Sequence, residues 1–75
     1  MEKKSELDVK VGAEIRRIRQ EQKRSQESFA YDCGVNRAYM GVLERGEKAM
    51  SIDMAKRIIL CLGLSLGEFF TGMGE

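Results

Sequence analysis

The stretch that decides the fold runs from Ser25 to Gly46 and reads SQESFAYDCGVNRAYMGVLERG. Ser25 and Asn36 each precede a run with helical periodicity, and such polar residues favour the N-cap position. Gly34 and Gly46 follow these runs, where glycine favours the left-handed backbone that ends a helix. The inward faces of the two runs hold Phe29, Ala30, Cys33, Met40 and Leu43. The pattern predicts two short helices joined by a tight turn.

The residues before this stretch predict a longer helix. Ser5 and Asp8 have the spacing of a capping box, in which the side chain of each residue accepts a hydrogen bond from the backbone amide of the other. Gly12 is expected to weaken the first turns, so that the helix starts nearer Val9, because glycine is a poor helix former. The apolar face of this helix comprises Leu7, Val11, Ile15 and Ile18.

Two further helices are predicted after Gly46. Ser51 caps a helix that ends at Gly63, and its apolar stripe comprises Ile52, Ala55, Ile58, Ile59 and Leu62. Ser65 and Glu68 form a capping box that opens a short helix with Leu66, Phe69 and Phe70. Residues 1–4 are expected to be frayed and residues 71–75 mobile. The chain 1–75 is therefore interpreted as one compact all-α, five-helix domain with a core over about residues 7–70.

The composition argues against several classes of protein. The chain has 75 residues, no histidine and no run of 18 apolar residues, so we expect no metal site and no membrane span. It has no glycine-rich phosphate loop and no nucleophile–base pattern, so we expect neither an enzyme nor a cofactor or small-molecule ligand. Cys33 and Cys61 form no CxxC pair, and we expect them to be buried, reduced thiols of a cytoplasmic protein.

The positive charge is concentrated in the first third of the chain. The formal net charge is only +1, but residues 1–24 carry eight Lys and Arg against five Asp and Glu, a balance of +3. Residues 25–50 and 51–75 each balance at −1. A basic patch on one face can bind phosphate whatever the total charge. A solvated helix of mixed charge is the alternative for residues 1–24.

Two helices joined by a short turn with glycine form the helix-turn-helix unit, whose second helix reads DNA bases in the major groove. The outward face of the second helix is predicted to read bases, and it comprises Arg37, Ala38, Tyr39, Gly41 and Val42. Arg37 suits guanine, because its guanidinium binds O6 and N7 together, whereas Ala38 and Val42 suit thymine methyl groups. Gly41 is predicted to allow close approach to DNA, with drift at an exposed site as the alternative. For Tyr39 the alternative is packing.

The DNA backbone needs polar and cationic partners as well. Gln26 lies at the positive N-terminus of its helix, which favours a phosphate contact. The other predicted phosphate contacts are Lys23, Arg24, Asn36, Arg45 and Lys48. For the four cations, a solvated surface position is the alternative.

These residues resemble the Cro- and phage-repressor-like (XRE-type) helix-turn-helix regulators. The resemblance rests on IRRIR at 15–19, SQESFA at 25–30, CGV at 33–35, LERG at 43–46, SID at 51–53 and LGLSLGEFF at 62–70. Within the family, NRAYMGVLERG at 36–46 is most similar to the controller proteins of restriction–modification systems. A phage- or plasmid-type repressor and an antitoxin-like protein-interaction module are the alternatives.

The resemblance implies a lambda-repressor-like fold and a homodimer that binds a two-fold symmetric operator in double-stranded DNA, with RNA polymerase as a candidate further partner. It also implies an ion pair between Arg19 and Glu44 that orients the reading helix, where a phosphate contact of Arg19 is the functional alternative. Because one helix-turn-helix unit covers only a half-site, a self-complementary surface is expected. Its predicted contacts are Met54, Leu60, Cys61, Leu66 and Phe70, with individually exposed apolar residues as the alternative.

Overall fold

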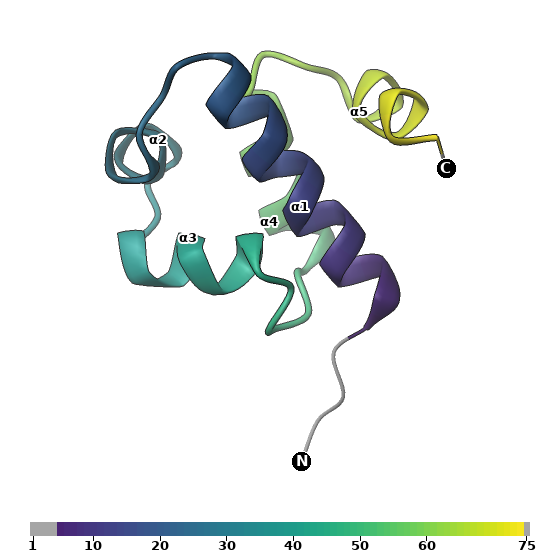
Figure 1. Ribbon diagram of the computed structural model, residues 1–75, viewed down its shortest axis with the longest axis horizontal. Coiled ribbons are helices and arrows are strands. Elements are labelled where there is room, and N and C mark those ends of the chain that lie inside the picture. Colours follow the sequence, from purple (N-terminus) through teal and green to yellow (C-terminus); the bar gives the residue numbers. More distant parts are fainter. Residues whose placement is uncertain (1–4, 75) are drawn as a thin grey trace.

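The computed structural model describes residues 5–74, and within them it contains five α-helices and no strand. The helices are α1 (Glu6–Glu21), α2 (Gln26–Cys33), α3 (Arg37–Glu44), α4 (Ile52–Cys61) and α5 (Leu66–Met73). In Figure 1, α2 and α3 lie on one side of α1 and α5 lies on the other. The predicted all-α, five-helix fold is confirmed.

Local capping signals set the boundaries of the helices. Each helix begins after a side chain that accepts hydrogen bonds from backbone amides of the first turn, namely Ser5, Ser25, Asn36, Ser51 and Ser65. After each helix the chain passes through a residue in the left-handed conformation, namely Lys23, Gly34, Gly46, Gly63 and Gly74. Lys23 is the exception to glycine, with φ of 60°. A β-carbon in this region costs about 1–2 kcal/mol.

Gly12 brings α1 and α3 into close contact. A β-carbon at Gly12 would lie 2.3 Å from the carbonyl oxygen of Leu43 and 2.6 Å from that of Glu44. The prediction that Gly12 delays the helix is wrong, since α1 begins at Glu6, where the Ser5 hydroxyl accepts from the Asp8 amide. Gly12 lets the backbones of α1 and α3 pack closely, and this contact outweighs the poor helix propensity of glycine.

One apolar core joins all five helices. Its buried members are Val11, Ile15, Phe29, Ala30, Cys33, Met40, Leu43, Ile58, Ile59, Leu62 and Phe69. Two residues predicted to face inward do not, because Leu7 is 54% exposed and Ile52 is 82% exposed. Both stand in the first turn of a helix, whose end remains in solvent while the later residues of the apolar face are buried or half-buried.

The C-terminal helix extends further than predicted. Helix α5 continues through Met73, which packs against the core, and Gly74 ends it in the left-handed conformation. Residues 71–73, predicted to lie beyond the helix, belong to α5, and the mobility of the tail stays a prediction. Residues 1–4 and 75, also predicted to be frayed or mobile, lie outside the described residues.

Candidate nucleic-acid interface

Helix α3 presents a narrow outward strip. Met40 and Leu43 are fully buried on its inner side. Arg37 and Ala38 are exposed at its start, whereas Tyr39 and Val42 are half-buried. Tyr39 also packs against the core, as its alternative interpretation expected. The most accessible part of the predicted reading face is therefore the first turn of α3.

Gly41 is covered rather than open, contrary to the prediction of an exposed mid-face position. It is buried, and a β-carbon there would lie 3.0 Å from Arg45 Nη1 and 3.6 Å from Gln26 Oε1. These two side chains cross over the glycine. Together with neighbouring groups they line a hollow of about 250 Å³, which is bordered by Arg16, Arg19, Gln26, Gly41, Glu44 and Arg45.

Arg19 and Glu44 form a buried ion pair under this hollow. Arg19 Nε donates to Glu44 Oε2 at 2.7 Å, and Arg19 Nη2 donates to Glu44 Oε1 at 3.0 Å. The two side chains are only 8% and 2% exposed. Arg19 Nη1 also donates to the Arg24 carbonyl at 2.9 Å. The pair fixes the last residue of α3 to α1 through bidentate, charge-assisted hydrogen bonds, and Arg19 is turned away from any surface phosphate.

Two amide side chains hold the starts of α2 and α3. Gln26 Nε2 donates to Glu44 Oε1 at 3.1 Å, so the ion pair orients the carboxamide that begins α2. Asn36 Oδ1 accepts from the Ala38 and Tyr39 amides at 2.8 and 3.3 Å. Asn36 thereby caps α3 directly before Arg37.

Arg24 makes its contacts within the protein, which disfavours its predicted phosphate contact. Its guanidinium lies 4.6 Å from the centre of the Phe29 ring and donates to Asp32 at 2.8 Å. It also donates to the Cys61 carbonyl at 2.9 Å. These partners come from α2 and α4, so Arg24 joins the α1–α2 connection to the two helices. Both terminal nitrogens, Nη1 and Nη2, donate within the protein.

The remaining cations differ in their surroundings. Lys23 and Lys48 are exposed, and Arg45 is exposed but donates to Glu47 at 3.0 Å. The sequence interpretation missed Arg16, an exposed residue that borders the hollow beside Gln26 and Arg45. Its position three residues before Arg19 on α1 places the two on the same side of the helix, and that spacing was the available signal.

Sequence comparison places these features in a known family. A helix-turn-helix family model matches residues 15–69. The control protein C.BamHI of Bacillus amyloliquefaciens is 35% identical over 67 residues, which cover 85% of this chain and 83% of that protein. This chain belongs to the helix-turn-helix family of control proteins. The control protein C.MunI of a Mycoplasma species is 29% identical over 68 residues, covering 89% of this chain and 92% of that protein.

A solved control-family structure has the same fold. The restriction–modification controller protein C.Esp1396I, crystallised as a tetramer on its natural 35-base-pair operator, matches with a TM-score of 0.86. The two chains are 32% identical, and the match covers 92% of this chain and 91% of that one. The predicted membership of the Cro-like regulators, and the similarity to controller proteins within them, is confirmed.

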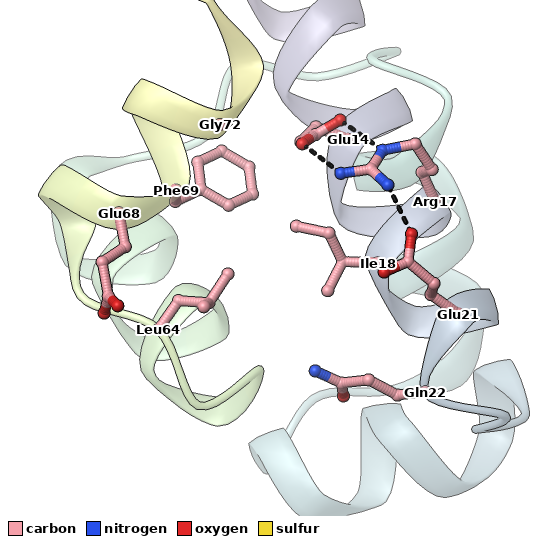
Figure 2. A pocket seen from close by; sticks show the side chains of 9 residues that line it. All are labelled: Glu14, Arg17, Ile18, Glu21, Gln22, Leu64, Glu68, Phe69 and Gly72. Atoms are coloured by element: carbon pink, nitrogen blue, oxygen red, sulfur yellow. Dashed lines mark hydrogen bonds and ion pairs between the residues drawn. The ribbon is translucent and has the colours of Figure 1, made fainter.

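The opposite side of this control-family chain is acidic. A hollow of about 320 Å³ lies between α1 and α5. Figure 2 shows that Ile18, Leu64 and Phe69 point toward one another there. Its other lining residues include Glu14, Glu21 and Glu68, with Arg17 as the one cation. Arg17 donates to both oxygens of Glu14, at 2.9 and 2.8 Å, and to Glu21. This charge does not suit phosphate, so α3 is the better candidate for DNA.

The predicted dimer contacts lie on α4 and α5 and differ in exposure. Leu60 is 54% exposed and Leu66 is 36% exposed. Phe70 is half-buried, and its ring meets the buried Phe69 ring edge-on at 5.2 Å. Met54 and Cys61 are half-buried against the core. No described helix is long and apolar enough to cross a membrane.

Proposed function

We propose that this chain is a sequence-specific transcriptional regulator that binds a two-fold symmetric DNA operator as a homodimer, in the manner of a restriction–modification controller protein. The observation that carries the proposal is the first turn of α3. Arg37 is exposed there, directly after the Asn36 cap, while the far end of the same helix is fixed by the buried Arg19–Glu44 pair. A rigid helix with an exposed arginine at its N-terminal end suits base readout in the major groove.

In this proposal Arg37 reads guanine, and Ala38 and Val42 meet thymine methyl groups. Tyr39 borders the strip. Gly41 has no side chain, and this leaves room for the side chains of Gln26 and Arg45 to lie over α3 at the proposed DNA interface. With one strong hydrogen-bonding residue on the strip, DNA shape supplies part of the specificity.

The DNA backbone is proposed to run past the rim of the hollow. The exposed residues of this rim and its surroundings are Arg16, Lys23, Asn36, Arg45 and Lys48. Gln26 adds its carboxamide and the N-terminus of α2, where backbone amides favour an anion. Because phosphate contacts release counterions, binding is expected to weaken steeply with rising salt.

The proposed dimer surface consists of Leu60, Leu66 and Phe70. Half-sites of a two-fold operator lie about 34–36 Å apart, so a chain with one reading helix needs a second copy. Leu60 and Leu66 are apolar side chains left in solvent on two adjacent helices. Met54 and Cys61 are placed at the margin of this surface, because both pack partly against the core. The Cys61 sulfur also accepts a hydrogen bond from Arg24. Sedimentation that shows a monomer at high micromolar concentration would remove this proposal.

The partner of the chain is double-stranded DNA, and the site of action is the cytoplasm, where a bacterial operator lies. A regulator bound at a promoter meets RNA polymerase, which is the further partner that we propose. The family is of a DNA-binding regulator type, and we propose no catalytic role for any residue.

The decisive experiment substitutes Arg37. Arg37→Ala is expected to weaken operator binding by about 1–3 kcal/mol per half-site and to relax specificity at one base pair in each. Gel shift and footprinting on the DNA upstream of the protein's own gene measure both effects. Arg57→Ala is the matched control, because this exposed arginine lies on α4, outside the proposed DNA interface. Equal, unchanged binding of operator and unrelated DNA by Arg37→Ala would show that α3 does not read the bases.

A further inference from the structure

Two thiols lie at the ends of the packed helices α2 and α4, away from the proposed reading strip. Cys33 is the last residue of α2 and Cys61 is the last residue of α4. Both are free, and Cys61 packs against the core cluster that contains Cys33. Helices α2 and α4 pack together, so the fold joins two cysteines that are far apart in the sequence. Neither thiol has a part in the proposed DNA interface.

The two thiols differ in their surroundings. Cys33 is only 5% exposed, and burial together with the hydrogen bond that its thiol donates to Cys61 raises the pKa of the Cys33 thiol to about 12. Cys61 is half-buried, and Arg24 Nη2 donates to its sulfur at 3.9 Å. Partial exposure and a cationic neighbour are typical of cysteines that react with oxidants. Cys61 therefore suits the first reaction with an oxidant, and Cys33 suits the second.

We propose that Cys33 and Cys61 form a reversible redox site that peroxides oxidise to a disulfide within one chain. In the first step the Cys61 sulfur attacks hydrogen peroxide. The O–O bond breaks, the thiol proton leaves with the departing oxygen as water, and Cys61 becomes a sulfenic acid.

In the second step the Cys33 sulfur attacks the Cys61 sulfur. The S–S bond forms, the S–O bond breaks, and the hydroxyl group leaves as water with the Cys33 proton. The two thiols lose two electrons in total, and one peroxide is reduced to two waters. A small dithiol reductant restores both thiols by exchange.

The position of this disulfide gives it a consequence for the fold. Cys33 directly precedes Gly34, which begins the turn between α2 and α3. Oxidation would therefore link the end of α2 covalently to the end of α4. Disulfides in a reducing cytoplasm are usually transient and redox-sensing. The inference does not depend on DNA binding, and it is tested without DNA.

The test treats the reduced, full-length chain with hydrogen peroxide and follows intact mass, alkylation of free thiols and mobility on a non-reducing gel. The expected product is a single monomeric species that is lighter by two hydrogen atoms. It has no thiol open to alkylation until dithiothreitol is added, and it forms at a rate independent of protein concentration. Thiols that stay open to alkylation, or a product that is cross-linked between chains, would overturn the proposal.

Single variants separate the two roles. Cys33→Ser is expected to stop at a Cys61 sulfenic acid that dimedone traps, and Cys33→Ala repeats the test without a buried hydroxyl if serine unfolds the chain. Cys61→Ser is expected to keep its mass, because Cys33 is shielded. Arg24→Gln is expected to slow the oxidation of Cys61. Oxidation of Cys33 in Cys61→Ser as fast as in the unsubstituted chain would refute the assigned order.

Discussion

Two arginines on α1 form similar ion pairs in different surroundings. Arg17 and Arg19 each hold a glutamate through two hydrogen bonds. The Arg19–Glu44 side chains are 8% and 2% exposed and join α1 to α3. Arg17 is 55% exposed, its partner Glu14 is 11% exposed, and both lie on one helix. The same chemistry therefore orients the proposed reading helix in one place and supports a single helix in the other. Burial and sequence separation make the difference.

Removal of Glu44 is expected to have the largest effect. Glu44→Ala leaves the Arg19 guanidinium buried without its carboxylate, and loss of one partner of a buried pair commonly costs about 3–5 kcal/mol. A chain of this length has a total stability of roughly 4–11 kcal/mol. We expect a large fall of the urea midpoint and melting temperature, and weaker operator binding as a result. An unchanged melting temperature with lost DNA binding would instead give Glu44 a direct role at the DNA.

Glu21→Ala is the matched control, because it removes a glutamate from the solvent-exposed Arg17–Glu21 pair, both of whose members lie on α1. A double replacement sharpens the comparison. Arg19→Met with Glu44→Leu removes both buried charges, and such apolar replacement of a buried pair is often neutral or stabilising. We expect the double variant to be more stable than Glu44→Ala alone. If it is equally unstable, packing and not the unpaired charge explains the loss.

Gln26 tests the hydrogen bond that completes the buried pair. Gln26→Ala removes the donor to Glu44 Oε1. Hydrogen bonds to charged groups contribute about 1.5–3 kcal/mol, and we expect the lower value because Gln26 is only half-buried. Gln20→Ala, at an exposed glutamine of α1, is the control. Equal midpoints for the two variants in urea would mean that Gln26 adds nothing to the pair.

The boundaries of the helices were predictable because they depend on near neighbours. Ser25 and Asn36 bind amides two or three residues away, and Gly34 needs only its own backbone freedom. The central helices accordingly begin and end where the sequence indicates. Leu7 and Ile52 fit the helical period but stay exposed, since periodicity does not show where a neighbouring helix ends.

The candidate site was harder to predict because its partners are distant in sequence. Arg24 was interpreted as a surface cation, but Phe29, Asp32 and Cys61 surround it from two other helices. Gly41 was interpreted as open, although the side chains of Gln26 and Arg45 cover it. Charge counting cannot show which face of a helix meets another. The base-reading role of Arg37 remains a prediction.

Arg17 should contribute much less than Arg19. Arg17→Ala removes the hydrogen bonds to Glu14 and Glu21. Pairs with a solvent-exposed partner typically contribute about 0.2–1 kcal/mol, and we expect the upper end because the Glu14 side chain is only 11% exposed. We expect a melting temperature only slightly below that of the unsubstituted chain, measured at moderate salt. Added salt should shrink the difference further, because solvent ions screen exposed charges. A loss as large as that of Glu44→Ala would contradict the role assigned to burial.

Acid should remove the smallest of these contributions. The hydrogen bonds from Arg17 lower the pKa of Glu14 from its ordinary value of 4.5, so protons bind the unfolded chain more readily. The contribution of the ionised Glu14 to folding stability is fully present above the unfolded-state pKa. It is lost as pH falls through the lower folded-state pKa. The melting temperatures of the unsubstituted chain and Arg17→Met should therefore differ slightly at neutral pH and converge in acid. A difference that stays constant down to about pH 2, well below the ordinary carboxylate range, would mean that Arg17 acts through packing of its side chain and not through the charge of Glu14.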